Sequence, residues 1–114
     1  MPESASVSSP QVLLKRFADI SDRLAVAVTR EMELRDQKPL IKDEAIRRTM
    51  GRDGVSYSAA ERTAEDDSFY AEHLKLLRYV AENVQRLHGQ KTAIEMQFRL
   101  AMLLLEHSLK EVPV

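Results

Sequence analysis

The stretch RRTMGRDGVSYSAAERTAEDD, residues 47–67, decides the fold, because it separates two long segments that carry a helical pattern. Gly51 and Gly54 predict the end of one helix, since glycine readily adopts the conformation in which helices stop. Ser58 with Glu61 predicts a capping box, in which the serine side chain accepts a hydrogen bond from the first turn of a new helix. The stretch therefore predicts a corner between two helices.

The segment before the corner predicts an amphipathic helix over about residues 10–36. Ser9 followed by Pro10 is typical of a helix start, with serine as the cap and proline in the first turn. Apolar residues then recur at spacings of three and four: Leu13, Phe17, Ile20, Leu24, Ala27 and Leu34, with Val28 and Met32 widening the stripe. Pro39 predicts the end of this helix because proline lacks an amide donor. A short helix over about residues 43–50 would follow.

The segment after the corner predicts one long helix over about residues 58–110. A three-and-four spacing of the coiled-coil type continues through Tyr70, His73, Leu77, Val80, Val84, Leu87, Lys91, Ile94, Phe98, Ala101 and Leu105. Residues 67–110 would span roughly 65 Å, of which the first helix would cover only about 40 Å. Part of the long helix therefore requires another partner.

That partner could be the short helix over about residues 43–50 or a second copy of the chain, and the run LAMLLL, residues 100–105, favours a contribution from the second copy. Six consecutive apolar residues cover every side of a helix, whereas one antiparallel partner helix buries only one stripe. Burial in an interface with a second copy of the chain would remove these side chains from water. The candidate oligomer interface consists of Ile94, Phe98, Ala101, Met102, Leu103, Leu104 and Leu105. The run is far shorter than the roughly 18 to 20 apolar residues of a membrane span, so we expect no membrane insertion.

Two residues interrupt the long stripe near its middle. Lys91 occupies a position of the stripe, and Gly89 lies beside it, where glycine costs about 1 kcal/mol relative to alanine. Lys91 either extends its ammonium group to solvent where one packing partner ends, or sets the register by pairing with an acidic residue of a partner. The sequence leaves both interpretations open.

Composition limits the class of protein. The 114 residues include three glycines, no tryptophan and no cysteine, and the formal net charge is -1. We expect an all-α helical hairpin with coiled-coil-like packing, forming one domain over residues 9–114 after a flexible tail at residues 1–8. The near-zero net charge creates no global attraction to nucleic acid or an anionic membrane. A polar N-terminal stretch without a secretory pattern favours a cytoplasmic protein.

The corner is the one segment whose residues suggest a chemical site. Gly51 and Gly54 have the G-x-x-G spacing of one nucleic-acid-binding loop, but that loop belongs to folds that contain a sheet. No phosphate-binding G-x-x-x-x-G-K-[ST] motif occurs in the chain. A calcium loop centred on Gly54 fails because Thr49, Gly51 and Ala60 would stand at ligand positions. We therefore expect neither a phosphate nor a cation site here.

Four arginines remain as the better functional candidates: Arg47, Arg48, Arg52 and Arg62, here called the corner arginines. Clustered guanidinium groups can contact the phosphates of a nucleic acid or an acidic protein partner. However, Asp43 and Glu44 lie four residues before Arg47 and Arg48, where intrahelical ion pairs would neutralise them.

The histidines predict no metal site, because His73, His88 and His107 lie too far apart along the chain to share one helical face. His73 is expected to be a partly buried residue of the stripe. No nucleophile motif is present, so we expect no catalytic residues and no cofactor.

The run from Asp43 to Leu105 resembles small helical proteins encoded in phage and prophage gene clusters, often near replication and recombination genes. The resemblance rests on Arg47 and Arg48, on Ser58 to Arg62, and on Asp66 to Tyr70, followed by one long helix. It covers about half the chain and implies a genomic context without implying a mechanism.

Two functions follow as hypotheses. The first is a non-enzymatic, self-associating helical adaptor of phage or mobile-element origin, which binds a protein partner through a helical surface. The second is a nucleic-acid-binding accessory factor for replication or recombination, which would use the corner arginines.

Overall fold

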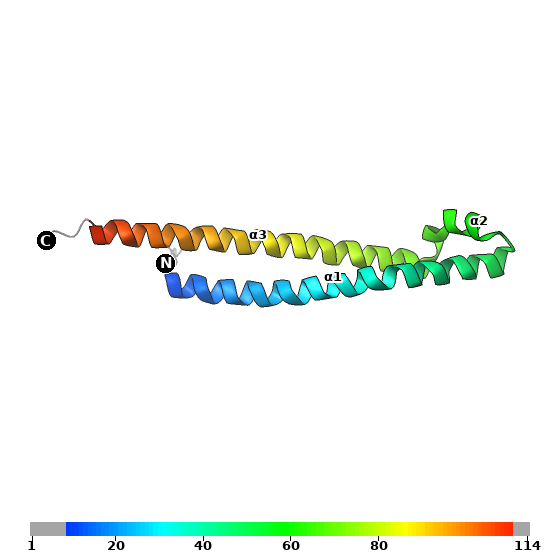
Figure 1. Ribbon diagram of the computed structural model, residues 1–114, viewed down its shortest axis with the longest axis horizontal. Helices are drawn as coiled ribbons and strands as arrows, with labels where there is room; N and C mark the ends of the chain where they lie inside the picture. The colour runs from blue at the N-terminus through cyan, green and yellow to red at the C-terminus, as the bar shows by residue number, and fades with distance from the viewer. Residues whose placement is uncertain (1–8, 111–114) are drawn as a thin grey trace, which may run out of the picture. The chain divides into compact units, whose positions relative to one another are not determined.

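A computed structural model describes residues 9–110, although not the side chain of Lys110 (Figure 1). The described elements are α1 (Pro10–Asp53), α2 (Tyr57–Arg62), the short 3-10 helix η2 (Ala64–Asp66) and α3 (Ser68–Lys110). No strand occurs among these residues, so the prediction of an all-α helical hairpin is confirmed. The predicted tail at residues 1–8 lies outside the described residues.

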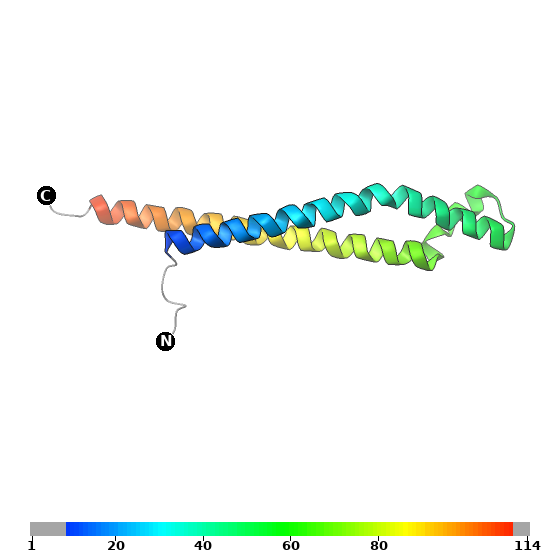
Figure 2. The ribbon, with the colours of Figure 1, turned by 90° about the horizontal axis from the view of Figure 1, so that it is seen from below.

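The chain divides into two compact units, and α1 and α3 each contribute to both. The first unit contains the N-terminal part of the chain up to Ala25 together with residues from Gln85 onward, and the second contains Val26–Val84. Within each unit, α1 and α3 run antiparallel and side by side (Figures 1 and 2). A prediction of one domain over residues 9–114 stays a prediction.

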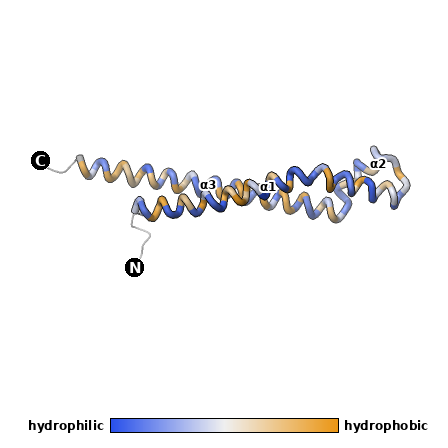
Figure 3. The backbone as a smooth tube through the Cα atoms, turned by 60° about the horizontal axis from the view of Figure 1, so that its bottom comes forward, coloured by the Kyte–Doolittle hydropathy of each residue, from blue (hydrophilic) through white to orange (hydrophobic). Residues whose placement is uncertain are grey.

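The core of the first unit follows the stripes predicted for both long helices. The buried side chains here are Leu13, Ile20 and Leu24 of α1 with Leu87 and Ala101 of α3. Phe17, Ile94 and Phe98 are half-buried at the positions between them. The apolar segments that form this seam alternate with polar ones along both helices (Figure 3). Burial at every third and fourth residue is the pattern of coiled-coil packing.

The core of the second unit includes the corner. A cluster of small and large apolar side chains joins the end of α1 to α2, η2 and the start of α3: Ala45, Ile46, Ala60, Ala64 and Tyr70, with Ile41, Met50 and Leu74 packed against it. Thus α2 and η2 cover the last turns of α1. Met32, which was predicted to widen the stripe, is 59% exposed, so that prediction was wrong.

The predicted end of the first helix before Pro39 was wrong, because α1 continues through Pro39 to Asp53. An interior proline costs about 3 kcal/mol. Fully buried residues on both sides, Leu34 before it and Ile46 after it, hold the flanking turns in place. Figure 2 shows α1 bending in this region, as expected for a helix that contains proline. The separate helix predicted over residues 43–50 is therefore the end of α1.

Only the second of the two glycines ends α1. Gly51 lies within the helix, whereas Gly54 has a φ of 66° and follows the last residue of the helix. The Gly54 amide donates a 2.9 Å hydrogen bond to the carbonyl oxygen of Met50. Glycine is favoured at this position because the left-handed backbone conformation is strained for residues that have a side chain.

The caps after the corner also differ from the predicted ones. Ser56, and not Ser58, caps α2, since its hydroxyl accepts a hydrogen bond from the Ala59 amide at 3.3 Å. The predicted continuous helix over residues 58–110 is interrupted: α2 ends at Arg62, and α3 begins only at Ser68. Asp67 caps α3 by accepting a hydrogen bond from the Tyr70 amide at 3.1 Å.

The predicted mismatch in helix length was wrong, because α1 has 44 residues and α3 has 43. Within the first unit, however, α3 extends past the start of α1 (Figures 1 and 2). The start of α1 itself is as predicted, with the Val12 amide donating to the Ser9 hydroxyl at 3.3 Å. The last turns of α3 therefore lack a packing partner among the described residues of α1.

Candidate interaction surfaces

Three of the corner arginines are paired with carboxylates. Arg47 donates a 2.8 Å hydrogen bond to Asp43, four residues earlier on α1, which raises the pKa of the guanidinium. Arg52 pairs with its neighbour Asp53 at 3.0 Å, and this hydrogen bond likewise raises its pKa. These two contacts are local and exposed, so they add little to stability.

Arg48 makes the one long-range ion pair among the corner arginines. It donates two hydrogen bonds of 2.9 Å to Asp67, and its guanidinium carbon lies 5.2 Å from the ring centre of Phe69. The pair with Asp67 raises the pKa of Arg48. A guanidinium that donates two hydrogen bonds to one carboxylate and also lies over an aromatic ring is strongly oriented. Arg48 therefore fixes the start of α3 against α1, where the sequence pattern predicted pairing with Glu44.

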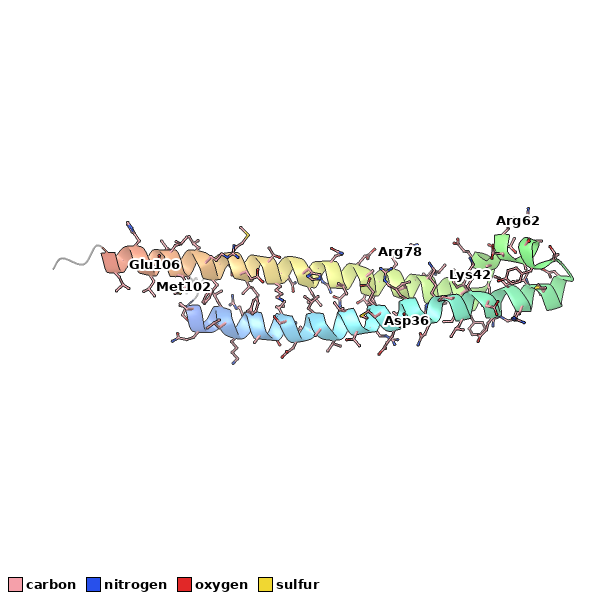
Figure 4. The ribbon with its side chains drawn as sticks, in the orientation of Figure 1. Asp36, Lys42, Arg62, Arg78, Met102 and Glu106 are labelled. Carbon is pink, nitrogen blue, oxygen red and sulfur yellow. The ribbon has the colours of Figure 1, made fainter. Side chains whose placement is uncertain are left out.

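Arg62 stands apart from the other three. It belongs to α2, its side chain projects outward from that helix (Figure 4), and its Nε donates a 3.4 Å hydrogen bond to the Ser58 carbonyl oxygen of the same helix. Residues 43–67 contain four arginines but seven Asp and Glu residues. The positive charge of the corner is thus compensated locally, which weakens its attraction for phosphate.

An open groove lies beside the Arg48–Asp67 pair in the second unit. It has a volume of about 620 Å³ and is lined by residues from both long helices: Ile41, Glu44, Arg48, Phe69, Glu72, His73 and Leu76. Two of its apolar lining residues are exposed, Phe69 at 72% and Leu76 at 40%. This groove with its apolar rim is a surface of the kind that binds partner helices or extended segments.

The C-terminal turns of α3 form a second apolar surface, here called the apolar end of α3. Its exposed members are Leu100, Met102, Leu103, Leu104, Leu105 and Leu109, with exposed fractions from 37% to 67%. Figure 4 places Met102 beside the start of α1 and Glu106 further along α3. Of the seven predicted interface residues, Ala101 is buried within the chain, and Ile94 and Phe98 are half-buried.

A smaller groove continues from the apolar end of α3 between the two helices of the first unit. It has a volume of about 280 Å³, and its lining is mostly apolar: Leu13, Leu14, Phe17, Ile94 and Phe98, with Glu95 and Arg99 at the edge. Leu14 is 53% exposed at this site. The predicted interface residues Ile94 and Phe98 therefore lie in a groove that α1 only partly fills.

Lys91 makes a contact within the chain that the sequence did not indicate, and both interpretations made from the sequence stay predictions. Its side chain is half-buried, and its Nζ lies 5.2 Å from the centre of the Phe17 ring. A cation over an aromatic face is attracted by the negative charge of the ring face. The charge is thus accommodated within the stripe by an aromatic residue of the facing helix.

His73 is buried, as expected for a residue of the stripe, and its Nε2 lies 2.8 Å from the carbonyl oxygen of Leu34. The carbonyl to which Pro39 cannot donate is the next one, at residue 35, so the histidine bonds the backbone beside the bend without replacing the missing donor. Among residues 9–110, no three His, Asp or Glu side chains are placed to hold a metal ion.

Comparison with known proteins identified no relative: no family model, no curated protein and no solved structure matches the chain. None of the helices within residues 9–110 is both long enough and apolar enough to cross a membrane. The interpretation of these surfaces therefore depends on their own geometry and chemistry.

The structure adds two residues that the sequence did not indicate. Asp67 joins the Arg48 pair and also caps α3, and Phe69 forms the exposed rim of the larger groove. An acidic residue directly before an apolar helical pattern is a known start signal, so Asp67 could have been found. Phe69 had no signal, because an isolated aromatic residue outside a stripe does not indicate a binding surface.

Proposed function

We propose that this chain is a non-enzymatic helical adaptor that self-associates through the apolar end of α3 and binds a protein partner through a helical surface. The observation that carries the proposal is the exposure of that end, where Leu103 is 61% and Leu109 is 67% exposed. Fully burying one leucine side chain is worth about 1.5 to 3 kcal/mol, so association that covers several leucines is favourable. A cytoplasmic location and a phage or mobile-element origin complete the proposal, the latter on the sequence resemblance alone.

Analytical ultracentrifugation over a range of protein concentrations tests self-association. We expect the mass of the unaltered chain to rise above that of a monomer in the micromolar range. The substitution Leu104→Glu should return it to a monomer, since burying a charge without a partner is costly. A matched control is Leu40→Glu, because Leu40 is 68% exposed but belongs to the second unit. A chain that stays monomeric at high micromolar concentration would refute the proposal.

The partner-binding part of the proposal concerns the larger groove in the second unit. Its apolar rim and the charged pair beside it offer both a hydrophobic contact and a defined orientation. We expect Phe69→Ala to abolish capture of a protein from extracts of the native host, while self-association persists. Capture that is unchanged by Phe69→Ala and by Leu76→Ala would argue against this surface.

The alternative is a nucleic-acid-binding accessory factor that uses the corner arginines. It has less support, because Arg47, Arg48 and Arg52 already have carboxylate partners. Such a factor would bind DNA at about 50 mM salt and lose that binding steeply as salt increases. Binding that survives replacement of these three arginines by alanine, or no binding at all, would exclude it.

A further inference from the structure

A second apolar stripe runs along α3 on the face away from α1. Met96, Leu100, Leu103 and His107 are separated by four, three and four residues, which is the spacing of a coiled-coil seam. The first seam passes through Phe98 and Ala101, which pack within the chain. In contrast, Met96, Leu100 and Leu103 are between 54% and 64% exposed. This part of α3 therefore carries two seams, only one of which is covered by described residues.

One edge of the second stripe carries two opposite charges. Arg99 directly precedes Leu100, and Glu106 follows Arg99 by seven residues, so both lie on the same side of the stripe. Both are exposed, and neither forms an ion pair with any side chain that the structure describes. Such edge positions of a coiled coil set the orientation and register of the partner helix.

The charges and the leucines select the same antiparallel register for two identical helices. A two-fold axis makes every contact occur twice, with the roles of the two copies exchanged. When Leu100 faces Leu103 of a second copy, the residues at the flanking edge bring Arg99 against Glu106 of that copy. In a parallel, in-register pair, Arg99 would instead lie beside Leu104 of the second copy and would not meet Glu106. Only the antiparallel arrangement therefore joins these opposite charges.

We infer that a second copy of the chain binds antiparallel along this face of α3, with Leu100 against Leu103 and Arg99 paired with Glu106, twice about a two-fold axis. The inference rests on the proposed self-association and specifies its geometry. Residues 96–109 span about 20 Å of helix, which gives an interface at the small end of the range for specific complexes. The dissociation constant is accordingly expected to be on the order of micromolar.

Charge reversal in the full chain tests this geometry by sedimentation velocity at low salt. Arg99→Glu alone and Glu106→Arg alone place like charges together at both ends, so each should weaken the dimer by about tenfold or more. The double variant should recover the dimer. A one-to-one mixture of the two single variants should also recover it as a heterodimer, because each chain then carries the charges that complement the other.

Two control variants match the change in charge. Arg23 and Asp19 form an exposed ion pair at 3.3 Å on α1, so Arg23→Glu and Asp19→Arg alter the net charge equally at another site. Both should leave the dissociation constant unchanged. Circular dichroism verifies that every variant keeps its helix content.

The outcomes separate this inference from the proposed function. A chain that dimerises, but whose single variants dimerise as tightly as before, overturns the antiparallel register and leaves self-association standing. Single variants that are weakened and do not recover on mixing likewise overturn the register. A chain that is monomeric in every form overturns the proposed function itself.

Discussion

Arg48 and Asp67 are joined by two hydrogen bonds of 2.9 Å that span 19 residues of sequence. The same Asp67 carboxylate caps α3 through the Tyr70 amide, and its side chain is only 10% exposed. The hydrogen bond from Arg48 lowers the pKa of Asp67 to about 2. One carboxylate thus links the end of α1 to the start of α3.

The first prediction concerns acid stability. Because the pKa of Asp67 is lower in the folded chain than its usual 3.8, its contribution is fully present above pH 4 and is lost as the pH falls toward 2. Discounted for the 42% exposure of Arg48, the loss should be on the order of 1 to 2 kcal/mol. Urea denaturation at pH 5 and at pH 2.5 measures it.

Asp67→Asn isolates the charge in this experiment, because asparagine is an equally good helix cap. This variant should lose less stability than the unaltered chain between the two pH values. Asp67→Ala removes both the charge and the cap, so at pH 7 it should cost about 1 kcal/mol more than Asp67→Asn. Equal pH dependence in the unaltered chain and in Asp67→Asn would contradict the role of the ion pair.

A second prediction concerns the buried hydrogen bond between His73 and the Leu34 carbonyl. His73→Leu keeps an apolar side chain in the seam but leaves a backbone acceptor without this donor, which should cost about 1 to 3 kcal/mol of unfolding free energy. Tyr79→Leu, at an exposed position of the same helix, should change stability by less than about 0.5 kcal/mol. The free energies come from urea denaturation, and equal costs for both variants would rule out the hydrogen bond as the cause.

Ser21 gives a third prediction, since its hydroxyl oxygen is buried and has no hydrogen-bond partner. Ser21→Ala removes this unsatisfied group and introduces the best helix former. We expect it to stabilise the chain by about 0.5 to 1 kcal/mol, measured by thermal denaturation. Ala25→Ser, at an exposed position of α1, should have a small opposite effect, and destabilisation by Ser21→Ala would reveal a partner for the hydroxyl.

The two corner glycines provide a fourth prediction with opposite signs. Nothing lies within 4 Å of a side chain added at either Gly51 or Gly54, so backbone conformation alone determines the outcome. Gly51→Ala should stabilise α1 by about 0.5 to 1 kcal/mol, because Gly51 lies within the helix. Gly54→Ala should destabilise the chain by about 1 kcal/mol, because φ is 66° there. Thermal denaturation of both variants tests the pair, and equal signs would contradict it.

The periodic features were predictable from the sequence because they arise locally. The three-and-four spacing identified the buried residues of α3 and those of α1 as far as Leu34, but not the buried Ala45, Ile46 and Thr49. The Ser9 cap was equally clear, since its hydrogen bond depends only on neighbouring residues. By contrast, Pro39 is a local stop signal that the buried turns on both sides override. The sequence of residues 30–45 does not show whether the burial of these turns outweighs the cost of the interior proline.

The candidate surfaces were only partly predictable, for a related reason. The sequence indicated the leucines at 103–105, and these are exposed. It also indicated an arginine cluster, but it did not show that Arg48 forms an ion pair with Asp67, which directly precedes α3. Exposure and long-range pairing depend on which segments lie side by side.

The sequence by itself determined that the chain forms helices and which face of each one is apolar, because hydrogen bonds and side-chain spacing act within a few residues. Only the tertiary structure decided where the helices begin and end around residues 54–67, and that α1 passes through Pro39. It also decided that the apolar end of α3 remains exposed. These outcomes depend on the burial gained by packing distant segments together, which exceeds the local preferences of single residues.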